Sequence, residues 1–162
     1  MEKRSIEIKW GIIFSIVLLI WMFGERLFGL HDTYIEKHAI YTNFFAVLAI
    51  AIYLFALYDK RKNYYNGYMS WREGFISGLF ITLVILILSP LTQYIISQYV
   101  SPEYFPNIIR HSVDKGEMTR NQAEEYFSLK NYIVLTAVWA VISGVITAAL
   151  TALIMRKNKK RL

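Results

Sequence analysis

Four long apolar stretches divide the chain, and charged residues stand between them or near their ends. Asp, Glu, Lys and Arg are absent from residues 10–24, 39–58, 75–102 and 131–155, runs of 15 to 28 residues. About 20 mainly apolar residues cross a hydrocarbon core of ~30 Å as a helix. None of the four runs carries the polar stripe that a helix of a soluble bundle needs. The pattern predicts membrane-spanning helices near residues 10–30, 39–58, 73–100 and 131–155.

Composition supports an all-α integral membrane four-helix bundle that forms one domain over residues 1–162. The chain is 56% hydrophobic and only 19% charged, against ~25% charged in an ordinary soluble domain. A soluble globular protein is therefore excluded. The chain has no cysteine, so disulfides, thiolate metal sites and cysteine nucleophiles are excluded as well.

The distribution of charge predicts the orientation of the spans. With four spans, the N-terminal tail, the linker near residues 59–73 and the C-terminal tail share one side, which holds 12 basic and four acidic residues. The other side holds six basic and eight acidic residues. Because cytoplasmic segments are enriched in Lys and Arg, both termini are expected in the cytoplasm. The net charge of +6 is then explained by topology, and no nucleic-acid partner is predicted.

The longest polar segment, residues 101–130, is predicted to fold into two short extracytoplasmic helices. The first has Ser101 as N-cap, Pro102 at its first position and Gly116 as C-cap. The second starts at Thr119, with Gln122 completing a capping box. Thirty residues exceed a plain connector, which favours a cap over the bundle or a docking surface. A flexible loop without a partner is the alternative.

Small residues recur at four-residue spacing in the last two spans and predict close helix packing. The third span begins with a GxxxG motif, and the fourth carries a ladder of small residues. Packing between spans three and four within one chain is favoured over a homodimer face. The helix-packing residues are Gly74, Gly78, Ala140, Gly144, Ala148 and Ala152.

Pro90 lies in the middle of the third span. Proline removes one backbone donor and clashes with the preceding turn, so a helix kink is predicted there. A kink that shapes packing is favoured over a gating hinge.

Glu25 and Arg26 are the only charged residues within an apolar span. Ionisable groups at membrane depth suggest function, but 15 residues at 1.5 Å each place Glu25 ~22 Å from Trp10, near the outer boundary. The pair is therefore interpreted as interfacial, with side chains that reach toward the headgroups. The interiors of the other predicted spans hold no Asp, Glu, Lys, Arg or His, which argues against a proton-coupled pump.

The first outer loop carries four residues able to bind a divalent metal: His31, Asp32, Glu36 and His38. Their spacing matches no compact ligand motif, so no metal site is predicted. No nucleophile elbow, phosphate-binding glycine loop or HExxH motif is present. No catalytic residue, cofactor or enzyme activity is therefore expected.

Several stretches resemble one family: residues 67–78 (GYMSWREGFISG), 100–104 (VSPEY) and 115–124 (KGEMTRNQAE), followed by the glycine- and alanine-rich last span. They are similar to a domain-of-unknown-function family of small four-span inner-membrane proteins from Bacteroidetes. The resemblance covers most of the chain. It implies a bacterial inner-membrane location and four helices, but no activity, cofactor or catalytic residue.

These observations predict a non-enzymatic protein of the bacterial inner (cytoplasmic) membrane. It is expected to act through packing with itself, as a homo-oligomer, or with another membrane protein, in contact with the lipid bilayer. The alternative is a small oligomeric transporter or channel component. A pore needs a polar stripe along one span, and the serines and threonines of the fourth span are its only candidate.

Overall fold

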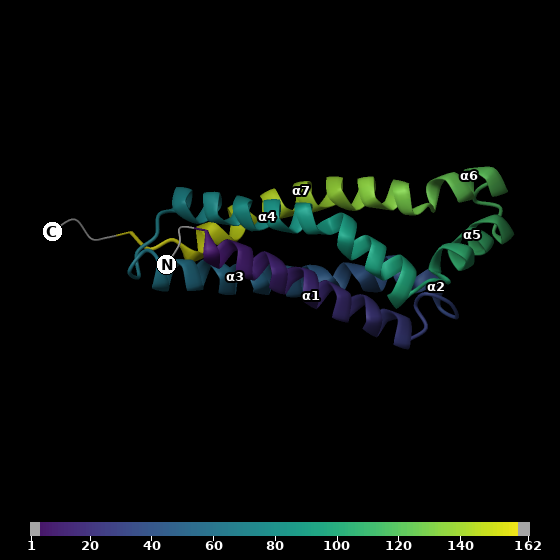
Figure 1. The fold of residues 1–162 in the computed structure, drawn as a ribbon, viewed down its shortest axis with the longest axis horizontal. Coiled ribbons are helices and arrows are strands. Elements are labelled where there is room, and N and C mark those ends of the chain that lie inside the picture. Colours follow the sequence, from purple (N-terminus) through teal and green to yellow (C-terminus); the bar gives the residue numbers. More distant parts are fainter. Residues whose placement is uncertain (1–3, 159–162) are drawn as a thin grey trace. The chain divides into compact units, whose positions relative to one another are not determined.

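The computed structural model describes residues 4–158, and the chain there is helical, with one isolated antiparallel bridge between Met69 and Lys157 (Figure 1). The elements in chain order are α1 (Ser5–Leu27), α2 (Ile35–Tyr41), the 3₁₀ turn η1 (Thr42–Phe44), α3 (Phe45–Asn63), α4 (Trp71–Ile95), the π-helical turn η2 (Ile96–Val100), α5 (Tyr104–Asp114), α6 (Arg120–Tyr126) and α7 (Leu129–Met155). Four helical segments are long and apolar enough to cross a membrane: Ser5–Leu27, Ile35–Asn63, Trp71–Val100 and Leu129–Met155. The predicted all-α fold with four such spans is confirmed.

Two of the spans start earlier than the hydrophobic pattern predicts. The first begins at Ser5 instead of near residue 10, and the second at Ile35 instead of near residue 39. The 3₁₀ turn η1 joins α2 to α3 without a loop, so the second span includes His38. His38 is the fourth residue of this longer span and lies near its start, outside the interior that the hydrophobic pattern outlined.

By packing, the chain divides into two compact units. Unit 1 contains residues 4–15, 46–88 and 138–158 of the described chain, and unit 2 contains residues 16–45 and 89–137. Each long helix contributes one part to each unit. The division within α4 falls between Leu88 and Ser89, next to Pro90, whose missing N–H interrupts the hydrogen bonding of the helix.

The core of unit 1 joins α3, α4 and α7. Its buried members are Tyr53, Ala56, Ile81, Ile85 and Ala148. The Tyr53 and Thr82 hydroxyl oxygens lie 2.8 Å apart, so the buried phenol is hydrogen-bonded. In Figure 1 the beginning of α1 and the end of α7 lie at the same end of this unit.

Small residues bring α4 and α7 into close contact within unit 1. A methyl group at Gly78 would lie 2.5 Å from Cβ of Ala148, and one at Gly74 would lie 3.1 Å from Cβ of Ala152. A methyl group at Gly144 would overlap the side chain of Thr82. Ala140, one turn before Gly144, is half-buried. Most of the small-residue ladder thus faces a helix of the same chain.

A buried ion pair links α1 and α3 in unit 1. Glu7 and Lys60 are each 1% exposed, and Lys60 Nζ donates to Glu7 Oε2 at 3.0 Å. Ser77 of α4 donates to Glu7 Oε1 at 2.9 Å. The hydrophobic pattern places Glu7 and Lys60 in polar segments flanking the spans, so this pair was not predicted.

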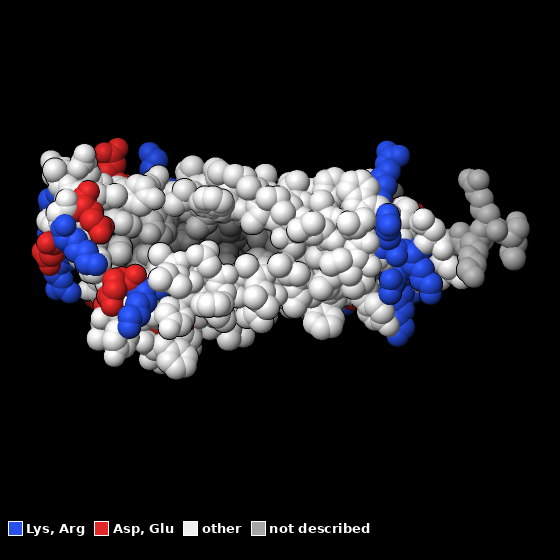
Figure 2. Space-filling view, turned by 180° about the vertical axis from the view of Figure 1, so that it is seen from behind, with Lys and Arg blue, Asp and Glu red and all other residues white. Residues whose placement is uncertain are grey.

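Charge is distributed differently over the two units, as Figure 2 shows. At the end of unit 1 where α1 begins and α7 ends, Lys and Arg predominate among the exposed charged side chains: Lys9, Lys62, Arg72, Arg156 and Lys157. Over α5 and α6 of unit 2, acidic and basic side chains are mixed.

The segment between α4 and α7 is folded, and we call α5 and α6 together the cap. The capping box of Thr119 and Gln122 is present at the start of α6, as predicted. Gly116 ends α5 with φ +70°, and the N–H of Glu117 bonds to the carbonyl of Ser112 at 3.0 Å, as in a Schellman motif. The predicted start of α5 is wrong: Glu103, not Ser101, occupies its N-cap position.

Candidate functional site

The end of α1 positions three potential ligand residues within unit 2. Gly29 follows α1 with φ +73°, a conformation that favours glycine. The N–H of Leu30 bonds to the carbonyl of Glu25 at 3.0 Å, which closes the helix. The chain then turns back, because the N–H of Tyr34 bonds to the carbonyl of Gly29 at 2.8 Å and α2 begins at Ile35. This reversal brings His31 and His38 to Glu25.

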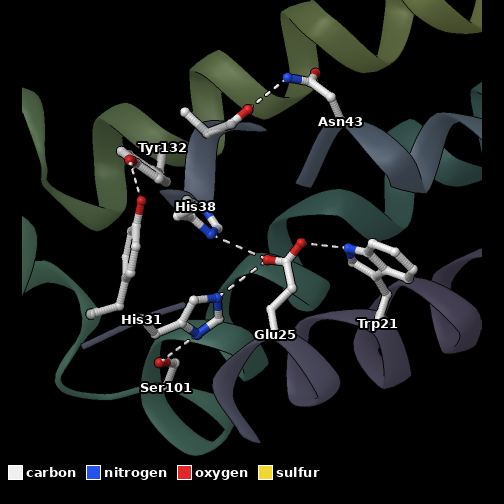
Figure 3. A network of polar contacts seen from close by, with 9 residues as sticks. Trp21, Glu25, His31, His38, Asn43, Ser101 and Tyr132 are labelled. Carbon is white, nitrogen blue, oxygen red and sulfur yellow. Dashed lines mark hydrogen bonds and ion pairs between the residues drawn. The ribbon is translucent and has the colours of Figure 1, made fainter. Parts of the chain in front are cut away.

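Glu25 is the centre of this cluster (Figure 3). Its side chain is buried, and Trp21 Nε1 donates to its Oε1 at 2.5 Å. Its second oxygen, Oε2, lies 3.4 Å from Nε2 of His31 and 3.2 Å from Nδ1 of His38. Within residues 4–158, this is the one group of three or more His, Asp and Glu residues with donor atoms close enough to hold a metal ion. We call Glu25, His31 and His38 the Glu25 cluster.

His31 connects the cluster to the cap. Its ring is 2% exposed, and Nδ1 lies 2.8 Å from Oγ of Ser101. The amide of Asn107 in α5 donates to the His31 carbonyl oxygen at 3.1 Å. Ser101, predicted as a helix cap, thus uses its side chain to orient an imidazole instead of a helix N-terminus.

His38 contacts Glu25 without forming a hydrogen bond to it. Its Nδ1 approaches Glu25 Oε2, but the two groups are not in hydrogen-bond geometry. Among the described residues, Nδ1 of His38 is the one buried side-chain nitrogen or oxygen without a hydrogen-bond partner. Buried polar atoms are nearly always paired, so this nitrogen marks a position where a partner is missing.

An aromatic wall covers the cluster. The ring of Tyr104 lies 5.2 Å from that of His31 and 5.1 Å from that of His38, measured between centroids. The hydroxyls of Tyr104 and Tyr132 are 3.3 Å apart. Burial, together with the neighbouring Tyr132, raises the pKa of the Tyr104 phenol far above its usual range. The phenol therefore stays protonated and neutral beside the cluster.

The other ionisable residues singled out from the sequence lie apart from this cluster. Asp32 and Glu36 are exposed, and Asp32 accepts a hydrogen bond from the N–H of Thr33. Arg26 is exposed and donates to the Val100 carbonyl at 2.6 Å. The buried carboxylate of Glu25 does not fit a side chain that reaches toward the headgroups, whereas the interfacial position of Arg26 stays a prediction. The sequence analysis placed the two histidines in one candidate metal site with Asp32 and Glu36, which lie in the same outer loop. Glu25, the acid that they contact, was assigned to the first span instead.

The hydroxyls of α7 bond along their own helix. Those of Thr136, Ser143 and Thr151 donate to the carbonyls of Tyr132, Trp139 and Thr147, four residues earlier, at 2.7, 2.6 and 2.6 Å. Most hydroxyl donors of the candidate polar stripe are therefore used in hydrogen bonds to the backbone of α7 itself.

A separate groove of about 480 Å³ lies where α6 meets α7. It is lined by both polar side chains and apolar surface, from Gln122, Glu125, Tyr126, Ser128, Lys130, Asn131 and Val134. Glu125, its one acid, is exposed. The groove offers a surface for binding, and Glu125 and Lys130 are its charged lining residues.

Comparisons with known proteins identify a family. Residues 9–157 match the family model described as protein of unknown function DUF4199. Comparison with curated proteins and with solved structures gives no match. Because the match covers nearly the whole chain, the protein belongs to the DUF4199 family.

Proposed function

We propose that this DUF4199 protein is a non-enzymatic, multi-pass protein of the bacterial inner membrane that acts by binding another membrane protein through its cap. The observation that carries the proposal is the folded segment between α4 and α7. His31 connects it to the spans through Ser101 and Asn107. Ordering about 30 residues costs conformational entropy. A plain connector between two spans needs no such order and no buried polar contacts, so the fold of this segment suggests a role in binding.

The orientation of the protein follows from its charges. The end of unit 1 carries the exposed basic residues, with Lys62 and Lys157 among them, whereas the cap mixes both signs. Lys and Arg are enriched in cytoplasmic segments. We therefore place both termini and the α3–α4 loop in the cytoplasm and the cap on the extracytoplasmic side.

A partner of different sequence is favoured over a second copy of the chain. The small residues that would build a homodimer face, Gly78 and Ala148 among them, contact each other within unit 1. The pore alternative loses its main support as well, because the hydroxyls of α7 bond along their own helix. The groove between α6 and α7 is a concave surface that the cap offers to a partner.

In-cell photo-crosslinking tests this function. A photo-reactive amino acid replaces Tyr126, an exposed residue that lines the groove, and, as the matched control, Ile20, an exposed apolar residue of α1. We expect a discrete adduct with another membrane protein from position 126 and none from position 20. Adducts only between copies of the chain, or none from position 126, would overturn the proposal.

A further inference from the structure

We infer that the Glu25 cluster binds one divalent transition-metal ion, and that its donors suit Zn²⁺ best. The site would use Oε2 of Glu25, Nε2 of His31 and Nδ1 of His38, which all lie within 4.8 Å of one another. Carboxylate oxygens and imidazole nitrogens are common zinc ligands, and three protein ligands leave one position for water or another group. This inference goes beyond the proposed function, because it holds whether or not the cap has a partner.

The spacing of the donors fits a tetrahedral ion. Zn²⁺ lies ~2.0–2.2 Å from nitrogen and oxygen ligands, which separates two ligands of a tetrahedral site by about 3.3 Å. The two separations that involve Glu25 are 3.4 Å to His31 and 3.2 Å to His38, and the two imidazole donors lie within 4.8 Å of each other. An ion therefore fits among these atoms with small side-chain adjustments.

A second layer of contacts orients two of the three donors toward the cluster. Ser101 occupies Nδ1 of His31, so that Nε2 points to Glu25. Trp21 occupies Oε1 of Glu25, so that Oε2 points to the imidazoles. Metal-binding histidines almost always use their other ring nitrogen in this way, and ligating carboxylates are themselves hydrogen-bonded.

The charge of the cluster also favours a cation. Among the described residues, the ion-pair partners of Glu25 are the two imidazoles, with no Lys or Arg. Arg26, its neighbour in sequence, donates to the Val100 carbonyl instead. A buried carboxylate needs a compensating positive charge. A divalent ion supplies it and also contacts Nδ1 of His38, which makes no hydrogen bond.

Metal binding to the purified full-length protein tests this inference. The detergent-solubilised chain is stripped with a chelator and titrated with Zn²⁺ in competition with a chromogenic zinc indicator. Co²⁺ is titrated in parallel, because its visible absorption reports tetrahedral coordination. The variants are His38→Ala and Glu25→Gln. The matched control is His111→Ala, which removes the third histidine of the chain, a residue outside the cluster.

We expect one Zn²⁺ per chain, a tetrahedral Co²⁺ spectrum and a higher melting temperature with metal. Each cluster variant should weaken Zn²⁺ binding at least ~10-fold, and His111→Ala should bind as the wild type does. If a cluster variant does not fold, the Zn²⁺ stoichiometry and the Co²⁺ spectrum of the wild type still show whether the site exists. Absence of saturable binding to the wild type, an octahedral Co²⁺ spectrum, or binding that survives both cluster variants would overturn the inference.

Discussion

The ammonium of Lys60 lies 3.0 Å from the carboxylate of Glu7, and both side chains are almost completely buried between α1 and α3. Taking two charges out of water is costly, and their attraction repays this only while both partners are present. Ser77 adds a hydrogen bond to the same carboxylate. Arg4 also pairs with Glu7, at 3.1 Å, so Lys60 and Arg4 together neutralise the buried carboxylate.

Removing one partner should destabilise the protein more than removing both. We expect Glu7→Gln to lower the stability by ~3–5 kcal/mol, because it removes the charge that pairs with the buried ammonium of Lys60. Lys60→Met should lower it less, because Arg4 still pairs with Glu7 at 3.1 Å. The double variant should melt above at least one of the two single variants. Thermal melting in detergent measures this, with Lys62→Met, at an exposed position two residues later, as the control. Single variants that melt as the wild type does would show that the pair is not buried.

Close packing between α4 and α7 should make Gly78 intolerant of larger side chains. Gly78→Leu pushes atoms into Ala148, where a methyl group already comes within 2.5 Å. Overpacking of this kind costs typically ~1–3 kcal/mol. The melting temperature should fall for Gly78→Leu and change little for Gly24→Leu, because Gly24 has open space around it. Equal melting of the two variants would contradict this contact.

The proposed orientation predicts opposite labelling of two engineered cysteines. The chain has no cysteine of its own, so Lys62→Cys and Lys115→Cys, both at exposed positions, each report one side of the membrane. An impermeant thiol reagent added to cells with a permeabilised outer membrane should label position 115, and position 62 only after lysis. Labelling of position 62 in unlysed cells would reverse or refute the topology.

Burial of Tyr104 predicts a loss of stability at alkaline pH. Its pKa is raised in the folded chain, whereas the unfolded phenol ionises near pH ~10. Its contribution to stability is therefore complete below pH ~10 and decreases as the pH rises above that value. We expect the melting temperature to fall less between pH 9 and 11 in Tyr104→Phe than in the wild type. Tyr34→Phe, at an exposed position, should follow the wild type.

The spans and the capping signals could be predicted because they depend on local patterns. Apolar runs determine the four long helices, and the capping box of Thr119 and Gln122 needs only its own four residues. The ends of the spans were harder to predict. Glu7 and Lys60 lie within α1 and α3, where they form a buried ion pair. A hydrophobicity pattern scores each charged residue separately and therefore places both outside the spans.

The Glu25 cluster could not be predicted because it depends on a turn and on tertiary contacts. The one local sign of it in the sequence is Gly29. Its left-handed conformation ends α1 and turns the chain back toward Glu25. Ser101 shows the same limit: its local pattern predicts an N-cap, but its hydroxyl contacts His31, 70 residues earlier. A buried partner distant in sequence outweighed the local preference.

Zinc K-edge X-ray absorption of the protein loaded with one equivalent of Zn²⁺ tests the Glu25 cluster most directly. We expect nitrogen and oxygen neighbours at ~2.0–2.2 Å, with outer-shell scattering from two imidazoles in the wild type and from one in His38→Ala. A shell of oxygen atoms without imidazole scattering, or a spectrum unchanged in His38→Ala, would contradict it.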